Sequence, residues 1–326
     1  MNGKRDFTAT AVFLTSGTPF EENSPTFARD GAVRDGLPPP LRNGRPGIFR
    51  LRGEIALLLL IVCHFFPACS IRATPADRYA TADMIAQRAG WEKSYLPTKN
   101  FTLTAYRRGA RPGAPLNLYI EGDGAAWIDR SWRSDDPTPK DPLVLELAVQ
   151  DPGANVAYLA RPGQYVAAGT PRGDPAYWSH RRFSPEVVAA LGEAADILKV
   201  KSGAEKINLV GYSGGAALAV LLAAERDDIL SLRTVAGNLD PAAVNRRHQV
   251  DPPAGSLDPL AAAEKIKGLP QRHFVGADDA VVPPVAARNF LARQGGDRRR
   301  LVVVPGAGHS RGWRERWREL SAYPLF

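Results

Sequence analysis

The sequence predicts an α/β domain, with a mostly parallel central sheet covered by helices on both faces. Short apolar runs without polar alternation recur along the second half of the chain, as in strands that are buried on both faces. Stretches of helical length and periodicity separate most of these runs, which is typical of successive strand–helix units. Because ligands of such sheets bind at the carboxyl ends of the strands, the residues that follow each apolar run are the first candidates for function.

The expected elements follow one another from residue 101 onward. The strands, with the loops that follow them, are expected at 101–108, 116–124, 155–163, 206–213, 232–240, 272–279 and 300–308. A helix is predicted at 184–200, with Ser184 as its N-cap and Glu186 in its first turn. Further helices are predicted at 214–227, at 283–294 after a proline, and at 311–323.

Two segments between these elements have no strong pattern. Residues 124–154 form a long insertion, and residues 178–184 (WSHRRFS) form a loop with aromatic and basic side chains. Either segment can line a pocket or only connect elements. A long segment without regular structure is more often functional, and we take Trp127 and Trp178 as candidate pocket residues.

The N-terminal part differs in composition from the rest. Residues 1–49 are rich in Gly, Pro and Arg, so we expect disorder. Residues 50–69 have two arginines, a short apolar stretch and then FPAC, the pattern of a signal peptide with a lipobox in which Cys69 is lipidated. A buried hydrophobic helix is the alternative. A signal peptide this far from Met1 also suggests translation from a non-AUG codon near Arg50, which would place residues 1–49 outside the native protein.

The remaining boundaries put a linker at 70–94 and the α/β domain at 95–326. This arrangement predicts a lipoprotein that faces the periplasm, or a secreted protein, at a bacterial cell envelope. Net charge is +8, but basic residues are interleaved with acidic ones, so no continuous basic surface for nucleic acid is expected. The two cysteines, Cys63 and Cys69, belong to no Cys/His cluster, so neither a disulfide framework nor a metal site is predicted.

Gly211-Tyr212-Ser213-Gly214-Gly215 is the motif that points most directly to chemistry. It fits G-x-S-x-G and stands directly between a predicted strand and a predicted helix, the setting of a nucleophile elbow. The small neighbours allow a sharp turn, and the N-terminal N–H groups of the helix favour negative charge near the serine oxygen. Ser213 is therefore the candidate nucleophile, and Tyr212 beside it is a third candidate pocket residue.

A serine hydroxyl needs a base and, behind the base, an orienting carboxylate. His309 follows the last predicted strand on a glycine-flanked turn and is preferred over His180 as the base. The carboxylate candidates are Asp278, Asp279 and Asp240. Asp279 is favoured because the order Ser–Asp–His along the chain and its G-x-x-D-x-x-V-P setting fit together.

Together GYSGG, GADDAVVP and GAGHS resemble the α/β-hydrolase superfamily over about residues 95–326. The stretches YIEGDGAAW, DPTPKDP and NVAYLARPGQY resemble a poorly characterised group of proteobacterial α/β-hydrolase lipoproteins, in which cysteine is usual where Gly163 stands here. The resemblance implies a catalytic Ser213–His309–Asp279 triad. It also implies an oxyanion hole made by the backbone N–H groups of Gly214 and Asp123, with no metal or organic cofactor.

The loop of that oxyanion hole carries two acids, Glu121 and Asp123. A carboxylate that points into the hole would repel the developing oxyanion. We therefore expect both side chains to turn away and pair with cations, for which Arg161 and Arg130 are the candidates.

Two functions remain open from the sequence. The first is a serine carboxylesterase or related acyl hydrolase that acts on a small ester or acyl substrate. The second is a non-catalytic envelope protein of the same fold that binds a ligand or a protein through residues 124–154, since a fold alone does not decide function.

Overall fold

An eight-stranded sheet forms the centre of the chain in the computed structural model, which describes residues 74–129, 131–251 and 254–326. The predictions for residues 1–69, Cys69 included, lie outside these residues, as does Arg130. Strand order is β1-β2-β4-β3-β5-β6-β7-β8. The strands are β1 (Glu92–Pro97), β2 (Thr102–Arg108), β3 (Leu116–Ile120), β4 (Asn155–Leu159), β5 (Ile207–Tyr212), β6 (Ile229–Val235), β7 (Gln271–Gly276) and β8 (Leu301–Val304).

The sheet is parallel from β4 to β8, and only β1 and β2 add antiparallel pairs at one edge. Each of the seven predicted strands has its counterpart in the structure. The central strand β4 is buried at all five positions, as expected of a strand covered on both faces. The predicted fold class is therefore confirmed.

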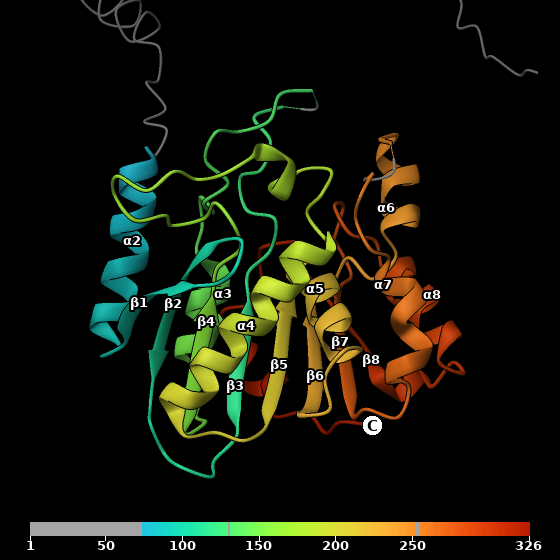
Figure 1. Cartoon of the computed structure of the whole chain (residues 1–326). Helices are drawn as coiled ribbons and strands as arrows, with labels where there is room; N and C mark the ends of the chain where they lie inside the picture. Colours follow the sequence, from blue (N-terminus) through green and yellow to red (C-terminus); the bar gives the residue numbers. More distant parts are fainter. Residues whose placement is uncertain (1–73, 130, 252–253) are drawn as a thin grey trace, which may run out of the picture. The chain divides into compact units, whose positions relative to one another are not determined.

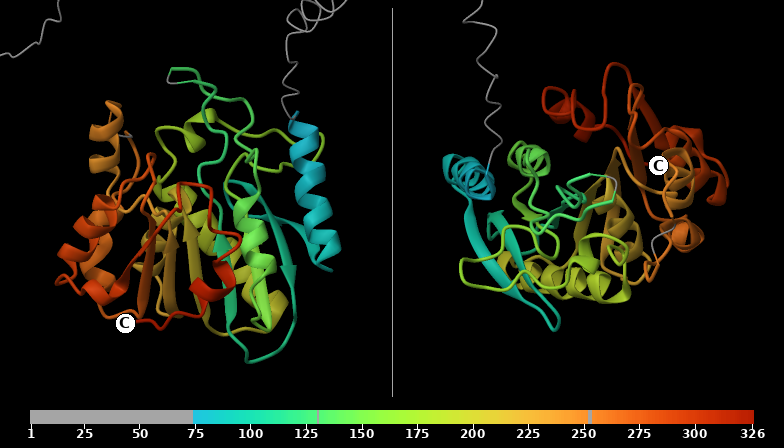
Figure 2. Two further views of the ribbon diagram at one scale, coloured as in Figure 1. Left: turned by 180° about the vertical axis from the view of Figure 1, so that it is seen from behind. Right: turned by 90° about the horizontal axis from the view of Figure 1, so that it is seen from above.

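Helices cover both faces of the sheet (Figures 1 and 2). One face packs against α4 (Pro185–Ser202), α5 (Gly214–Ala223), α7 (Pro259–Ala262) and α8 (Val285–Arg293). The other face packs against α2 (Pro75–Arg88), α3 (Leu143–Val149) and α9 (Trp317–Ser321). A further helix, α6 (Pro241–His248), follows β6, and the short 3₁₀ helix η1 (Pro175–Trp178) follows β4 in sequence.

Three sequence expectations need correction. The predicted linker at 70–94 contains helix α2 and the start of β1, and α2 begins at Thr74 with a capping box to Asp77. The insertion at 124–154 contains α3, whose apolar residues pack on the sheet. The closing helix is confined to α9, since the preceding residues 311–316 form turns.

Helix α5 begins directly after β5 and crosses the end of β3 very closely. A Cβ atom at Gly215 would overlap the backbone carbonyl oxygens of Glu121 and Ile120. Gly192 in α4 differs, because its Cβ would meet the Leu222 side chain at an ordinary 3.5 Å. The position of α5 thus depends on glycine at 215 and not on glycine at 192.

We predict opposite effects for Gly215→Ala and Gly192→Ala on the free energy of unfolding, measured by urea denaturation. Gly215→Ala should destabilise the fold by about 1–3 kcal/mol because backbone atoms must move. Gly192→Ala should stabilise it by up to about 1 kcal/mol through helix propensity. Equal effects of the two substitutions would contradict the close approach of α5 to β3.

Candidate active site

The three residues chosen as a triad lie together at the carboxyl ends of three strands. Ser213 follows β5, Asp279 follows β7 and His309 follows β8. The His309 Nε2 atom lies 3.0 Å from Ser213 Oγ, and His309 Nδ1 lies 2.9 Å from Asp279 Oδ2. The arrangement is a continuous hydrogen-bonded chain from hydroxyl to imidazole to carboxylate.

The backbone of Ser213 has the conformation that a nucleophile elbow requires. Its φ is 51° and its ψ is −120°, a region that residues other than glycine rarely adopt and that costs conformational energy. Hydrogen bonds hold the turn: Ser213 N–H donates to the Val235 carbonyl, and Asn238 N–H donates to the Ser213 carbonyl, both at 3.0 Å. The strained serine is therefore fixed by the neighbouring strand β6 and the loop after it.

The carboxylate of Asp279 is positioned by its own loop. Its Oδ1 atom accepts hydrogen bonds from the backbone N–H groups of Val281 and Val282, each at 2.8 Å, which leaves Oδ2 for His309. The two other candidates have different roles. Asp278 is exposed and faces Arg311 at 3.5 Å, whereas Asp240 caps α6 and accepts a hydrogen bond from Asn289.

Two aromatic residues fix the backbone of His309 through hydrogen bonds to its carbonyl oxygen. Tyr212 Oη and Trp313 Nε1 donate to the His309 carbonyl oxygen at 3.1 and 2.9 Å. The Tyr212 ring also packs on the imidazole, with ring centroids 5.3 Å apart. An imidazole whose Nδ1–H donates to Asp279 presents an unprotonated Nε2 to Ser213. This is the tautomer that can accept the serine proton.

Asp123 is paired with a cation, as predicted. Its Oδ1 atom pairs with Arg161 Nη1, and Arg182 Nε lies 3.6 Å from Oδ2. Desolvation raises the pKa of the Asp123 carboxyl, but Arg161 and Arg182 outweigh it and hold the pKa below its usual range. The pair packs against Gly214: a Cβ there would overlap the Asp123 carboxylate and lie 2.8 Å from Arg161 Nη1.

The prediction that Glu121 pairs with a cation was wrong. Glu121 is 2% exposed, and its carboxylate accepts hydrogen bonds from Tyr158 Oη at 2.9 Å and from Gly122 N–H at 2.8 Å. Burial raises the pKa of Glu121 to about 7, although both hydrogen bonds oppose the shift. The side chain is buried within the protein, and with this pKa it is about half protonated near pH 7.

The predicted oxyanion donors lie next to the nucleophile. Gly214 is the first residue of α5, and Asp123 stands in the loop after β3. Among the described residues, neither backbone N–H group donates a hydrogen bond.

A cavity of about 820 Å³ begins at Asp123, beside this site. Trp127 lines it, as do His180 and Arg182 from the 178–184 loop and His248 from α6. The two other aromatic residues expected in a pocket lie elsewhere. Tyr212 packs on His309, and Trp178 is 3% exposed with its Nε1–H bound to the Ser134 carbonyl.

Sequence reasoning missed Arg182 as a neighbour of Asp123, although the loop that carries it was selected. Gly163, where the resembling group has cysteine, has φ +82° and would place a Cβ 2.7 Å from the Trp178 ring. Glycine is therefore the residue that this turn accepts with Trp178 in place. Within the described part of the chain, no group of three His, Cys, Asp or Glu side chains could hold a metal ion.

Solved structures share this architecture at low sequence identity. An esterase from Pyrococcus furiosus, Pf2001, superposes with a TM-score of 0.52 at 14% identity, over 72% of this chain and 92% of that one. The chain has the α/β-hydrolase fold. An acylaminoacyl peptidase from Pyrococcus horikoshii has a TM-score of 0.53 at 14% identity, over 72% of this chain and 42% of that one. No protein-family model and no curated protein matches the sequence.

The burial of Glu121 in this α/β-hydrolase fold predicts a pH-dependent stability. The folded state holds the proton up to about pH 7 and the unfolded state only to about pH 4.5. The free energy of unfolding should therefore fall as pH rises from about 4.5 through 7, by a contribution on the order of 3 kcal/mol. Urea denaturation at several pH values measures this slope.

Glu121→Gln should remove that contribution, because the amide does not ionise. The matched control is Glu205→Gln at an exposed position, which should leave the slope as in the unmodified chain. A slope that is unchanged by Glu121→Gln would show that Glu121 is not the buried acid responsible.

Proposed function

We propose that this chain is a serine hydrolase that cleaves esters or related acyl bonds with Ser213, His309 and Asp279. The observation that carries the proposal is the hydrogen-bonded chain of these three side chains beside a strained serine at a strand–helix turn. Serine hydrolases need this combination of nucleophile, base and orienting carboxylate. Two of the similar structures are those of an esterase and of an acylaminoacyl peptidase, which supports the same reaction class.

The geometry suggests how each group would act. His309 Nε2 removes the Ser213 proton as Oγ attacks the substrate carbonyl, and Asp279 stabilises the resulting imidazolium. The N–H groups of Gly214 and Asp123 bind the oxyanion of the tetrahedral intermediate. His309 then protonates the leaving group, and water releases the acyl group by the same steps. The mechanism uses no cofactor or metal.

The substrate would be a small molecule that enters the cavity at Asp123. Trp127 offers an apolar surface there, while His180 and Arg182 offer polar contacts. A cavity of this size suits a small organic ligand. A carboxylesterase is the form of the proposal that the esterase likeness favours, and a peptidase of short acyl peptides is the nearest variant.

One observation favours the second candidate function, ligand binding without catalysis. The Asp123–Arg161 pair lies against Gly214, where the oxyanion would bind. If the Asp123 carboxylate repels an oxyanion more strongly than Arg161 attracts it, the chain would bind an acyl compound without cleaving it. The labelling experiment below separates the two functions.

We predict that a fluorophosphonate probe labels the protein at Ser213. Ser213→Ala should abolish labelling, and His309→Ala or Asp279→Asn should slow it about 10²–10⁴-fold by removing base catalysis. The readout is the labelling rate by gel fluorescence, with the labelled peptide identified by mass spectrometry.

The matched control is Asp278→Asn, which changes the adjacent exposed carboxylate and should leave the rate unchanged. An unmodified chain that does not react, although correctly folded, would contradict hydrolysis and support the ligand-binding function. Hydrolysis of p-nitrophenyl esters of increasing acyl length then maps the substrate preference.

We further propose that the protein is anchored at the cell envelope through Cys69, on the sequence pattern of residues 50–69. No helix among the described residues is long and apolar enough to cross a bilayer. Metabolic labelling with an alkynyl fatty acid should tag the protein in bacteria. Cys69→Ser should abolish the tag. Cys63→Ser leaves the lipobox cysteine in place and should keep the tag. Labelling that persists in Cys69→Ser would contradict this anchor.

A further inference from the structure

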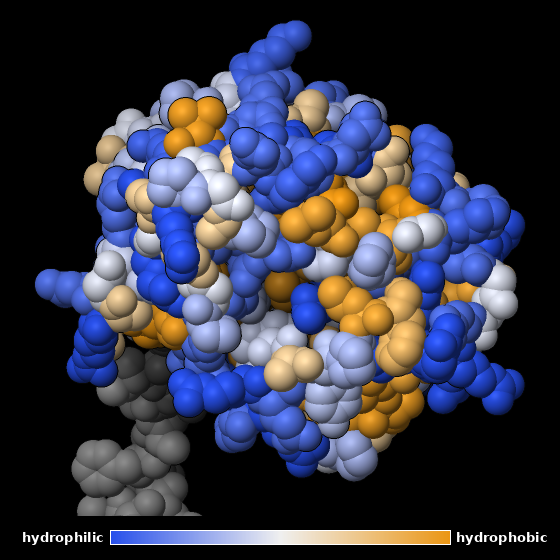
Figure 3. All heavy atoms as spheres, turned by 90° about the horizontal axis from the view of Figure 1, so that it is seen from below, coloured by the Kyte–Doolittle hydropathy of each residue, from blue (hydrophilic) through white to orange (hydrophobic). Residues whose placement is uncertain are grey.

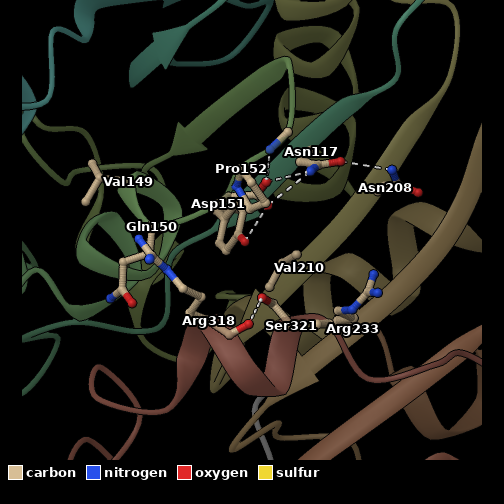
Figure 4. A pocket seen from close by; sticks show the side chains of 13 residues that line it. Asn117, Val149, Gln150, Asp151, Pro152, Asn208, Val210, Arg233, Arg318 and Ser321 are labelled. Carbon is tan, nitrogen blue, oxygen red and sulfur yellow. Dashed lines mark hydrogen bonds between the residues drawn. The ribbon is translucent and has the colours of Figure 1, made fainter.

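A second groove, separate from the cavity at Asp123, opens on the sheet face that packs against α3 and α9 (Figure 4). Its volume is about 750 Å³, within the range of small-molecule sites. Asn117 and Asn208 in its floor are the second residues of β3 and β5, whereas Ser213 follows the end of β5. The groove therefore lies toward the opposite ends of the strands from the candidate active site.

The floor of the groove is a closed network of hydrogen bonds. Asp151 accepts from Asn117 Nδ2, from Tyr119 Oη at 2.7 Å and from the Gly153 N–H at 2.7 Å. Asn208 in turn donates to Asn117 Oδ1 at 2.9 Å. These groups satisfy one another, so the floor is fixed before any ligand arrives.

Arg233 from β6 lines the same groove but takes no part in that network. Among the described residues it has no hydrogen-bond or ion-pair partner, and its Nε atom is buried; no hydrogen bond is drawn to it in Figure 4. Burial lowers the pKa of the Arg233 guanidinium and nearby Arg272 lowers it further, while Tyr119 and Asp151 oppose the shift. Arg233 is half-buried and its guanidinium has no partner among the described residues, so an anion in the groove would gain a charge-assisted contact.

The charges around Arg233 also favour an anion. Arg272 stands directly opposite Arg233 on the neighbouring strand β7, and like charges in that relation repel each other. Arg318 from α9 is the second basic residue that lines the groove. The carboxylate of Asp151 compensates in part, but its oxygens are already occupied by the floor network.

The rest of the groove's lining is mainly apolar, which indicates the kind of ligand that would fit. Val149, Pro152, Val210 and Ala322 contribute apolar surface beside the basic residues. Seen from the end where the parallel strands begin, the surface is hollowed, and hydrophobic and hydrophilic residues are mixed around the hollow (Figure 3). A ligand with a charged head and a short apolar body matches a groove that is lined by basic residues beside apolar ones.

We propose that this groove is a second binding site, for an amphiphilic carboxylate whose head group is held by Arg233. The planar guanidinium can bind a carboxylate through two parallel hydrogen bonds, and the apolar residues hold the adjoining chain. Arg318 and Ser321 from α9 line the same groove. The proposal is independent of the reaction at Ser213.

The test is isothermal titration calorimetry of the purified chain with octanoate, and with octan-1-ol as the uncharged comparison. Octanoate should bind saturably and octanol at least tenfold more weakly. Arg233→Met should weaken octanoate binding about 10–100-fold, the loss expected for a charge-assisted pair of hydrogen bonds. Arg293→Met, at an exposed position in α8 outside the groove, should bind as the unmodified chain does.

Two further variants separate binding in this groove from a folding defect of Arg233→Met and from binding in the cavity at Asp123. Ala322→Trp fills the groove without changing its charge and should also weaken binding at least tenfold; this covers the case in which Arg233→Met fails to fold. Trp127→Ala, in the cavity at Asp123, should leave octanoate binding unchanged. Binding that survives both Arg233→Met and Ala322→Trp, binding lost in Trp127→Ala, or no binding of octanoate at all would overturn the proposal.

Discussion

The positive φ of Ser213 is the constraint on which the site depends. Ser213 is the single residue between β5 and α5, and its hydroxyl projects from the turn toward the strand ends where Asp279 and His309 also lie. The conformation is unfavourable in isolation, and backbone hydrogen bonds to Val235 and Asn238 hold it. The close packing of α5 against β3 completes the restraint.

Electrostatic balance around the turn is the second requirement. Two acidic residues, Glu121 and Asp123, follow β3, and their carboxyl groups lie in different environments. Asp123 stays ionised because two guanidinium groups face it, whereas Glu121 is buried against Tyr158 with a pKa near 7. The pairing of Asp123 with Arg161 limits the net negative charge beside Gly214, where a hydrolase must stabilise an oxyanion.

Seven of the eight strands and the three site residues could be predicted because their signals are local, whereas the edge strand β1 was missed. Buried strands are apolar runs, and the site residues follow them directly. Helix α2 was missed although Thr74-Pro75-Ala76-Asp77 is a capping signal, because few apolar residues follow. The environment of Glu121 could not be predicted: it depends on Tyr158, a residue of β4 whose position is set by strand pairing. The unpartnered state of Arg233 likewise depends on residues that the fold brings together.

The central claim is that Asp279 holds His309 in the tautomer that can accept the Ser213 proton. Proton NMR of ¹⁵N-histidine-labelled protein tests it most directly, because an imidazole N–H bound to a buried carboxylate is strongly deshielded and protected from exchange. We predict one such signal, coupled to Nδ1 of His309, that is lost in Asp279→Asn and retained in Asp278→Asn. A His309 that carries its proton on Nε2, or a signal that survives Asp279→Asn, would contradict the account.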